Sequence, residues 1–245
     1  MTPRVTLATA TRVLSQLRRD PRTLALLIAV PCVLMTLLRF LFDSQPQTFD
    51  RIGGPMLGLF PFITMFIVTS ITMLRERVTG TLERLMTLPL AKLDLLLGYA
   101  IAFALLAAVQ SSVVSLLAFG PLGLDVQGSQ LAVVALAVGN AILGMALGLF
   151  ASAFARTEFQ AVQFMPAIVL PQLLLCGLFV ARDEMAHWLE VISYALPLTY
   201  AYDALARVTQ GLALDGWFAL DLVVMIGGTI LALALGAATL RRRTA

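Results

Sequence analysis

Six long apolar runs divide the sequence, and no other feature constrains the fold as strongly. The runs are 23–42, 53–74, 93–119, 131–155, 159–181 and 217–240. A helix of about 20 apolar residues spans the hydrocarbon core of a bilayer, whereas the strands of a membrane barrel are shorter and alternate in polarity. The composition agrees, because 60% of the residues are hydrophobic and only 13% are charged. The sequence therefore predicts an all-α integral membrane protein with six transmembrane helices, in a single transmembrane domain over 1–245.

Residues 1–22 carry five arginines among apolar residues. This pattern is typical of a basic amphipathic helix that lies on the membrane surface. A secretory signal peptide also begins with basic residues, but the run 23–42 is long enough to span and no Ala-x-Ala-like cleavage site follows it. We therefore interpret 1–22 as an interfacial helix and 23–42 as a retained first span.

A charged island, residues 75–92, separates the second and third runs. Its apolar residues recur at i, i+4, i+7 and i+8, namely Val78, Leu82, Leu85 and Met86. This spacing predicts a short amphipathic helix at a membrane surface, with charged residues on its other faces. Gly80 could end the preceding helix, Thr81 could cap the next one and Pro89 could stop it. The alternative is a solvated connector between two spans.

A second charged segment, residues 182–215, is too polar to span yet keeps an apolar period. Met185, Trp188, Leu189 and Ile192 fall at i, i+3, i+4 and i+7. After Pro197 a second stretch places apolar residues on one face and a charged pair, Asp203 and Arg207, at i, i+4. We interpret the segment as two short helices that dip into the interface or re-enter the bilayer, bringing Trp and Tyr side chains to headgroup depth.

The run 131–155 contains small residues at intervals of four, Gly144, Gly148 and Ser152. This spacing puts them on one helical face, where they would allow another helix to approach closely. Membrane helices are also rich in glycine in general, so simple enrichment is the alternative.

Basic residues are unevenly distributed in the six-span prediction. One side holds five in 1–22, four in the island, Arg156 and three at the C-terminus, whereas the other side holds four. Cytoplasmic loops carry the excess of Lys and Arg. We therefore expect both termini and the island on the cytoplasmic side of the membrane, and 182–215 outside. The net charge of +3 orients the chain and gives no reason to expect nucleic-acid binding.

Catalytic, cofactor and metal chemistry have little support in the sequence. His187 is the only histidine and forms a His-x-x-Glu with Glu190, which supplies too few ligands for a metal. Cys32 and Cys176 lie within spans and are interpreted as small apolar residues. The sequence also lacks the Gly-x-x-x-x-Gly-Lys-[Ser/Thr] phosphate-binding motif. We predict no catalytic, cofactor-binding or metal site in this chain.

The spans also lack a deep ionisable group of the kind that ion-driven carriers use. Asp94 and Asp221 lie at the ends of their runs, and the deeper polar side chains are neutral. A proton- or sodium-driven carrier usually needs such a group inside the membrane. We therefore expect energy to come from outside the chain, through the island.

Two stretches resemble one transporter family. Arg75-Glu-Arg-Val-Thr-Gly-Thr-Leu-Glu-Arg-Leu is similar to the Glu-Arg-Glu-x-Gly-Thr-Leu-Glu signature of type-2 ABC exporter permeases, in particular the branch of the daunorubicin-exporter membrane subunit. Pro171-Gln-Leu-Leu-Leu-Cys-Gly-Leu-Phe, followed by Leu196-Pro-Leu-Thr-Tyr, resembles the family pattern Pro…Ser-Gly…Asn-Pro-Leu-Thr-Tyr. Cys176 stands where Ser is common and Leu196 where Asn is common, which leaves the subfamily and substrate open.

The resemblance implies a permease subunit that pairs with a second copy or a related permease and docks onto a separate ABC ATP-binding subunit. ATP and magnesium would bind to that partner, and this chain would bind no cofactor. The residues at the ATPase-coupling interface would be Arg75, Glu76, Arg77, Gly80, Thr81, Glu83 and Arg84. Those of the outer gate or re-entrant segment would be Trp188, Pro197, Tyr200, Tyr202, Asp203 and Arg207.

The implied function is ATP-driven export across the membrane of a prokaryotic cell, with the first, second and fifth spans moving between inward- and outward-facing states. A polysaccharide path would need many aromatic side chains, and the chain has only two Trp and four Tyr, so we expect a hydrophobic drug-like or lipid substrate. One alternative is a secondary transporter or channel not coupled to ATP. An intramembrane enzyme is the other.

Overall fold

The computed structural model describes residues 3–81, 84, 92–213 and 215–239, and these residues are mainly helical. The elements are α1 (Pro3–Arg18), α2 (Pro21–Leu41), α3 (Pro46–Val78), α5 (Lys92–Phe119), α6 (Gln130–Ala151), α7 (Glu158–Leu175), the 3-10 turn η1 (Arg182–Glu184), α8 (His187–Ser193), α9 (Pro197–Thr209) and α10 (Gly216–Ala238). Within the described part, 6 helices are long and apolar enough to cross a membrane, namely α2, α3, α5, α6, α7 and α10. The predicted all-α membrane fold with six spanning helices is confirmed.

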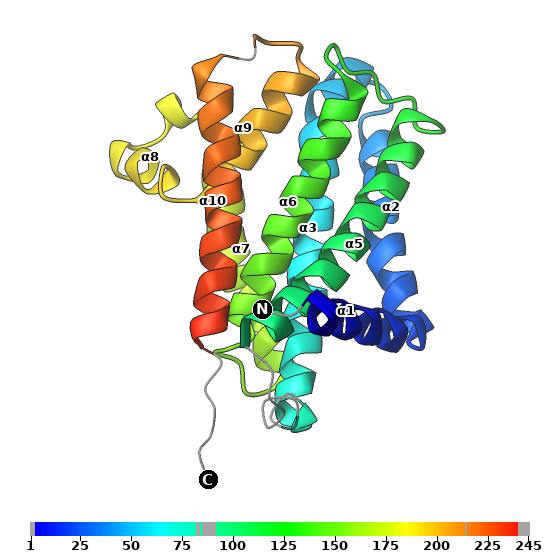
Figure 1. Ribbon diagram of the computed structural model, residues 1–245. Coiled ribbons are helices and arrows are strands. Elements are labelled where there is room, and N and C mark those ends of the chain that lie inside the picture. The colour runs from blue at the N-terminus through cyan, green and yellow to red at the C-terminus, as the bar shows by residue number, and fades with distance from the viewer. Residues whose placement is uncertain (1–2, 82–83, 85–91, 214, 240–245) are drawn as a thin grey trace.

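The six long helices run up and down between two ends of the bundle. The helix α1 lies across one end, and α8 and α9 lie at the other (Figure 1). We call these the α1 end and the α9 end. The last described turn of α10 returns to the α1 end (Figure 1). This alternation matches the predicted order of spans, with α1 and the described first residues of the island, 75–81, at the same end.

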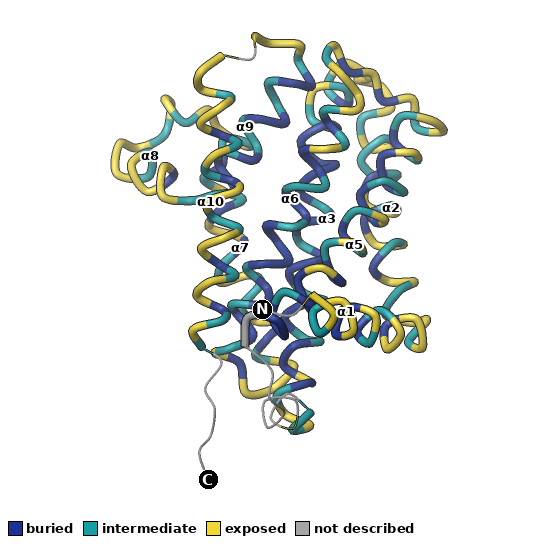
Figure 2. The backbone as a smooth tube through the Cα atoms, viewed as in Figure 1, coloured by how far each residue is buried: buried dark blue, intermediate teal, exposed yellow. Residues whose placement is uncertain are grey.

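The helices α3 and α6 form the centre of the bundle. In their most apolar stretches 67% and 61% of the residues are buried, against 17% in each of α2, α7 and α10. The burial pattern along the backbone shows the same contrast (Figure 2). The peripheral helices therefore present apolar side chains outward, as expected of surfaces that contact lipid or another membrane subunit.

The small residues of α6 bring it close to α3. A Cβ atom at Gly144 would lie 2.3 Å from the backbone oxygen of Phe62. At Gly148 a Cβ atom would lie 2.4 Å from the backbone oxygen of Phe66, and Ser152 is fully buried. Only glycine permits this distance between the two backbones, so the face packs within the chain, against α3.

The helix α3 is longer than the predicted span 53–74 at both ends. It begins at Pro46 and continues without a break through Pro55 and Pro61, although proline usually interrupts a helix. The Thr64 hydroxyl donates to the Phe60 and Pro61 oxygens, each at 3.1 Å, one turn after Pro61. At the other end, α3 includes residues 75–78 of the island.

The helix α7 is shorter than the predicted span 159–181. It ends at Leu175, and Gly177 follows with a φ of 96°, in the left-handed region. Glycine adopts this conformation without strain, so the backbone turns here. The chain then continues through η1 and α8 to α9.

The predicted pair of short helices after α7 is present as α8 and α9. One face of α9 is buried against the bundle and includes Leu198, Ala201 and Leu205. By contrast, α8 lies outside the bundle (Figure 1), and its Trp188 is 65% exposed. Only α9 is therefore part of the core.

Candidate functional site

At the α1 end, one polar cluster joins three helices. Arg12 of α1 forms an ion pair with Glu76 of α3, with 3.5 Å between Nη1 and Oε1. Its other terminal nitrogen donates to the Tyr99 hydroxyl of α5, and its guanidinium carbon lies 5.6 Å from the centre of the Tyr99 ring. We call Arg12, Glu76 and Tyr99 the inner junction. Because Glu76 is only 8% exposed, this charge is removed from solvent and depends on Arg12 for compensation.

Close packing holds α1 in place at the inner junction. A Cβ atom at Gly98 of α5 would lie 2.5 Å from the Cβ of Thr9. The buried residues of α1 follow one face, Thr9, Ala10, Val13 and Leu17. The amphipathic pattern of 1–22 therefore faces the bundle itself, chiefly α5, and not only a membrane surface.

A second ion pair joins the end of α3 to the start of α7. Arg75 contacts Glu158 through two bonds, 2.7 Å from Nε to Oε1 and 3.0 Å from Nη2 to Oε2. Both side chains are about half exposed. The last turn of α3 is thus connected to α1 and α5 through Glu76 and to α7 through Arg75, so a displacement of this turn would act on several helices at once.

The helix α3 ends where the island bends. The Gly80 amide donates to the Arg77 oxygen at 3.3 Å, and Gly80 has a φ of 72°, as the predicted helix-ending glycine requires. The hydroxyls of Thr79 and Thr81 lie 3.1 Å apart, and the Arg84 amide donates to the Gly80 oxygen at 3.0 Å. Glu83 and the apolar stripe residues Leu82, Leu85 and Met86 lie outside the described residues, as does Pro89.

The first island residues therefore differ from the prediction in one respect. Arg75, Glu76 and Arg77 belong to the last turn of α3 and not to a separate coupling helix that starts at residue 75. Backbone hydrogen bonds continue through these residues because side-chain charge does not interrupt a helix that projects beyond the apolar region. The break comes at Thr79 and Gly80, where the sequence predicts the end of the preceding helix.

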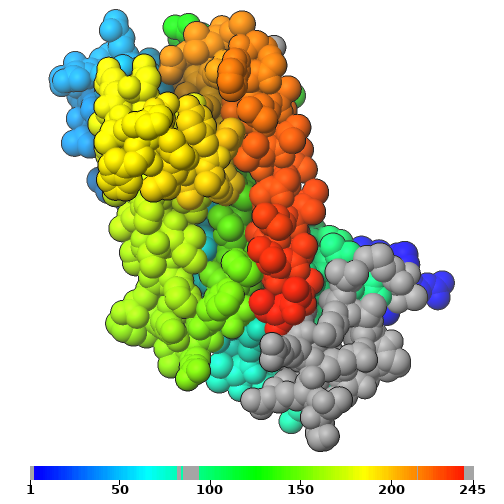
Figure 3. Space-filling view, turned by 90° about the vertical axis from the view of Figure 1, so that its left-hand side faces the viewer, coloured from blue at the N-terminus to red at the C-terminus, as the bar shows by residue number. Residues whose placement is uncertain are grey.

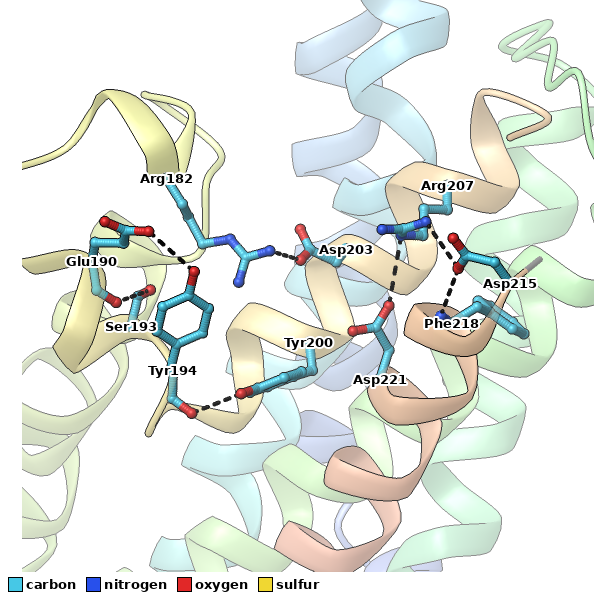
Figure 4. A network of polar contacts seen from close by, with 10 residues as sticks. All are labelled: Arg182, Glu190, Ser193, Tyr194, Tyr200, Asp203, Arg207, Asp215, Phe218 and Asp221. Carbon is cyan, nitrogen blue, oxygen red and sulfur yellow. Dashed lines mark hydrogen bonds and ion pairs between the residues drawn. The ribbon is translucent and has the colours of Figure 1, made fainter. Parts of the chain in front are cut away.

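At the α9 end, a polar network connects η1, α8, α9 and α10 (Figure 4). Arg182 binds Asp203, and its guanidinium lies 5.5 Å from the Tyr194 ring centre. Arg207 contacts Asp215 at 3.3 Å and approaches Asp221 at 3.9 Å. The outer network comprises Arg182, Glu190, Tyr194, Tyr200, Asp203, Arg207, Asp215 and Asp221.

The tyrosines of the outer network attach α8 to α9. The Tyr194 hydroxyl donates to Glu190 at 3.1 Å, which raises the pKa of Tyr194. The Tyr200 hydroxyl donates to the Tyr194 backbone oxygen at 2.8 Å. Burial raises the pKa of the Asp203 carboxyl, and the nearby Arg182 and Arg207 oppose that rise. The exposed helix α8 is therefore held by polar contacts more than by apolar packing.

An apolar pocket of about 260 Å³ lies between α2 and α3. Leucine, valine and isoleucine side chains form most of its wall, and Thr23, Thr64, Thr72 and Arg75 supply polar groups. Gln110 of α5 donates to the Leu27 oxygen at 2.9 Å and to the Thr64 hydroxyl, which fixes the three helices around the pocket. A small hydrophobic molecule would find both apolar contact and hydrogen-bond partners here.

Residues 4–209 match the sequence profile described as ABC-2 type transporter. The chain belongs to the ABC-2 type transporter family. It is accordingly the membrane component of an ABC transporter, a multi-pass permease with six apolar helices. The predicted resemblance to type-2 ABC permeases is confirmed at the level of this family.

Several curated ABC proteins are similar to this ABC-2 chain. ABC transporter G family member 20 of Dictyostelium discoideum is 28% identical over 68% of this chain and 23% of its own length. The Escherichia coli inner membrane transport permease YhhJ is 26% identical over 82% of this chain and 54% of its own length. The probable multidrug ABC transporter permease YbhR of the same species is 24% identical over 62% and 42%. The chain thus spans about half or less of these relatives.

The candidate residues of the ABC-2 permease fall into separate groups. Tyr200, Asp203 and Arg207 meet in the outer network, whereas Trp188 lies exposed on α8 and Tyr202 packs on the apolar core. Pro197 begins α9. Among the described residues Asp203 and Arg207 each pair with other partners, in place of the i, i+4 pair that the spacing suggests.

Sequence reasoning missed most members of the two clusters. Arg12 and Tyr99 belong to the inner junction, and the missed members of the outer network are Arg182, Glu190, Tyr194, Asp215 and Asp221. The signals were indirect, one of several arginines in an amphipathic segment and an acidic residue within an apolar run. Neither signal identifies a partner that lies far away in the sequence, such as Glu76, 64 residues after Arg12.

Metal ligation has no support in the part of the chain that the structure describes, where no three His, Cys, Asp or Glu side chains are grouped as metal ligands. His187 and Glu190 approach each other at 3.5 Å and form only a pair. Cys32 and Cys176 are free thiols.

Proposed function

We propose that this chain is the permease subunit of an ATP-driven exporter, powered by a separate ABC ATP-binding subunit that carries ATP and magnesium. The observation that supports this best is the last turn of α3, at the start of the island, which joins α1, α5 and α7 through Arg75 and Glu76. A partner that pushes on the island would move all these helices together. The family and the printed names of its relatives support the same assignment.

The substrate that we propose is a hydrophobic drug-like or lipid molecule that leaves the cytoplasm. The apolar pocket between α2 and α3 supports this class, because its wall is apolar with a few hydroxyl groups. Its position beside Arg75 also connects it to the turn that would receive motion. A secondary transporter or channel is the second candidate, and its supporting observation is the buried carboxylate of Asp221 in α10.

A second copy of this permease, or a related permease, is the proposed membrane partner. The peripheral helices α2 and α7 expose large apolar side chains, including Leu37 and Phe40 on α2 and Phe159 and Leu174 on α7. Membrane lipid would cover whatever part of these surfaces the partner leaves open. Helices at such a boundary could move relative to each other without unpacking α3 and α6.

The proposed orientation places the α1 end in the cytoplasm of a prokaryotic cell. Cysteines introduced at the exposed Thr79 should not react with a membrane-impermeant thiol reagent in intact cells, whereas cysteines at Asp125 or Glu184 should react. The background variant Cys32→Ala/Cys176→Ala removes the native thiols. Labelling at Thr79 in sealed cells would show that the α1 end lies outside the cell, which contradicts the proposed orientation.

Co-purification tests the proposed partnership. When the permease is expressed with a candidate ABC ATP-binding subunit, a tag on the permease should retain that subunit in detergent at a constant ratio. The same ATP-binding subunit expressed with an unrelated six-helix membrane protein should not be retained. Equal recovery in both cases, or no recovery with the permease, would contradict the proposal.

A further inference from the structure

A pocket of about 270 Å³ lies at the α9 end, between η1, α8, α9 and the start of α10. The lining residues relevant here are Arg182, Tyr194, Tyr200, Arg207, Trp217 and Asp221. Asp203, which pairs with Arg182, also lines the pocket. The pocket thus combines two cations, two carboxylates and aromatic rings. It lies at the other end of the molecule from the inner junction, so the proposed coupling does not use it.

Asp221 is the most unusual group of this pocket. The residue is 5% exposed, and its Oδ2 atom accepts no hydrogen bond in the described structure. The nearest cation is Arg207, whose Nε lies 3.9 Å away, beyond hydrogen-bond distance. A buried carboxylate without a hydrogen-bond donor is unfavourable. A ligand that brings an N–H donor to Oδ2 would remove that cost.

Arg182 and Arg207 supply positively charged hydrogen-bond donors to the same pocket. Each guanidinium carries five N–H donors. Arg182 donates to Asp203 through one of its terminal nitrogens, and Arg207 donates to Asp215 through one of its own. The pocket lining includes both guanidinium groups, which suit a phosphate because planar, paired donors match its oxygens.

The aromatic residues suit a cation beside Asp221. Tyr194, Tyr200 and Trp217 line the pocket, and Trp217 is 65% exposed at the start of α10. The faces of such rings attract ammonium groups. Tyrosine and tryptophan are also enriched at the depth of lipid headgroups, where this end of a spanning helix would lie.

We propose that this pocket binds the headgroup of phosphatidylethanolamine. The phosphate would contact Arg182 and Arg207, and the primary ammonium would donate to Asp221 between the aromatic rings. Below the pocket a face of α10 is uncovered (Figure 3), and its exposed apolar residues Leu220, Leu231 and Leu235, which helical spacing places on the same side as the pocket-lining Trp217, offer a surface for the acyl chains. The lipid would join α8, α9 and α10 from the membrane side. The only premise is that α10 spans the bilayer.

Tryptophan fluorescence can report on this site directly. The chain has two Trp, so the variant Trp188→Phe leaves Trp217 as the only reporter. Purified protein in detergent is titrated with dihexanoyl phosphatidylethanolamine, with dihexanoyl phosphatidylglycerol, which has the phosphate but no ammonium, and with soluble glycerophosphoethanolamine. We expect half-saturation by the ethanolamine lipid at a concentration at least tenfold lower than by either of the other two.

The variant Asp221→Asn tests the proposed ammonium contact. It should raise the half-saturation for the ethanolamine lipid at least tenfold and leave that for the glycerol lipid unchanged, whereas Asp183→Asn, an exposed carboxylate of η1, should change neither. Equal binding of the two lipids, or an ethanolamine preference that survives Asp221→Asn, would overturn the proposal. Equal binding of the soluble headgroup would overturn its assignment to a lipid.

If Asp221→Asn does not fold, native mass spectrometry of the unmodified protein decides the question. Protein extracted from an equimolar mixture of the two lipids should retain phosphatidylethanolamine preferentially. Retention of both lipids in equal amounts would refute the site.

Discussion

Replacing Arg12 with alanine is expected to lower the stability of the bundle by about 3 kcal/mol, because it leaves the Glu76 charge buried without a cation. Glu76 is only 8% exposed, so water cannot fully replace the guanidinium. The loss should appear as a lower midpoint of thermal unfolding in detergent, together with weaker association of α1 with the bundle. Tyr99→Phe, which removes one hydroxyl and keeps the ring, should cost about 1 kcal/mol.

The double variant Arg12→Ala/Glu76→Gln separates the ion pair from simple loss of packing. If the cost of Arg12→Ala comes from an uncompensated charge, making Glu76 neutral should recover part of the stability, and the two effects should not add. Additive losses would mean that Arg12 acts only through its contacts with the Tyr99 ring. Arg4→Ala, an exposed arginine on the same helix, is the matched control and should have little effect.

The second large effect is expected at the contact between α3 and α6. Gly148→Leu would place side-chain atoms where the Phe66 oxygen and the Thr69 hydroxyl already lie, at 2.4 Å and 2.2 Å from the new Cβ. Backbone atoms cannot move aside locally, so the two central helices must separate. We expect a loss of at least about 2 kcal/mol, with a lower unfolding midpoint and less protein in the membrane.

Gly227 provides the matched control, because it is also a glycine in a spanning helix but a Cβ atom added there would meet no neighbouring heavy atom within 4 Å. Gly227→Leu should therefore leave stability nearly unchanged. Comparable losses for Gly227→Leu and Gly148→Leu would show that leucine is disfavoured for a reason other than the α3–α6 contact. Unchanged stability of Gly148→Leu would show that the two helices can repack.

The long apolar runs made the spanning helices predictable, but they did not predict the residues at which these helices end. The run 53–74 locates the apolar part of α3, but hydrogen bonding continues to Val78 across three charged residues. At the other extreme, α7 ends at Leu175 while apolar residues continue, because Gly177 turns the backbone. Hydropathy reports which residues prefer lipid, and backbone geometry decides where a helix stops.

The polar clusters were largely unpredictable, because they depend on contacts between distant parts of the chain. Nothing in the sequence near Glu76 indicates that Arg12 lies beside it, and nothing near Asp221 indicates Arg207. Gly80 is the opposite case, since a glycine between charged helical residues predicts a helix end locally. Its left-handed conformation bears this out. The coupling role of Glu83, which lies outside the described residues, stays a prediction.

ATP hydrolysis by the assembled complex tests the central claim most directly. The permease and its ATP-binding subunit are purified together, and hydrolysis is measured for the unmodified permease, for Glu83→Arg in the island and for Glu184→Arg at the α9 end. Reversing a paired charge in a docked interface costs about 2–5 kcal/mol, so Glu83→Arg should reduce association and hydrolysis tenfold or more while the permease stays folded. Glu184→Arg should match the unmodified protein. Full association and hydrolysis with Glu83→Arg would contradict coupling through this residue and favour the island as a solvated connector.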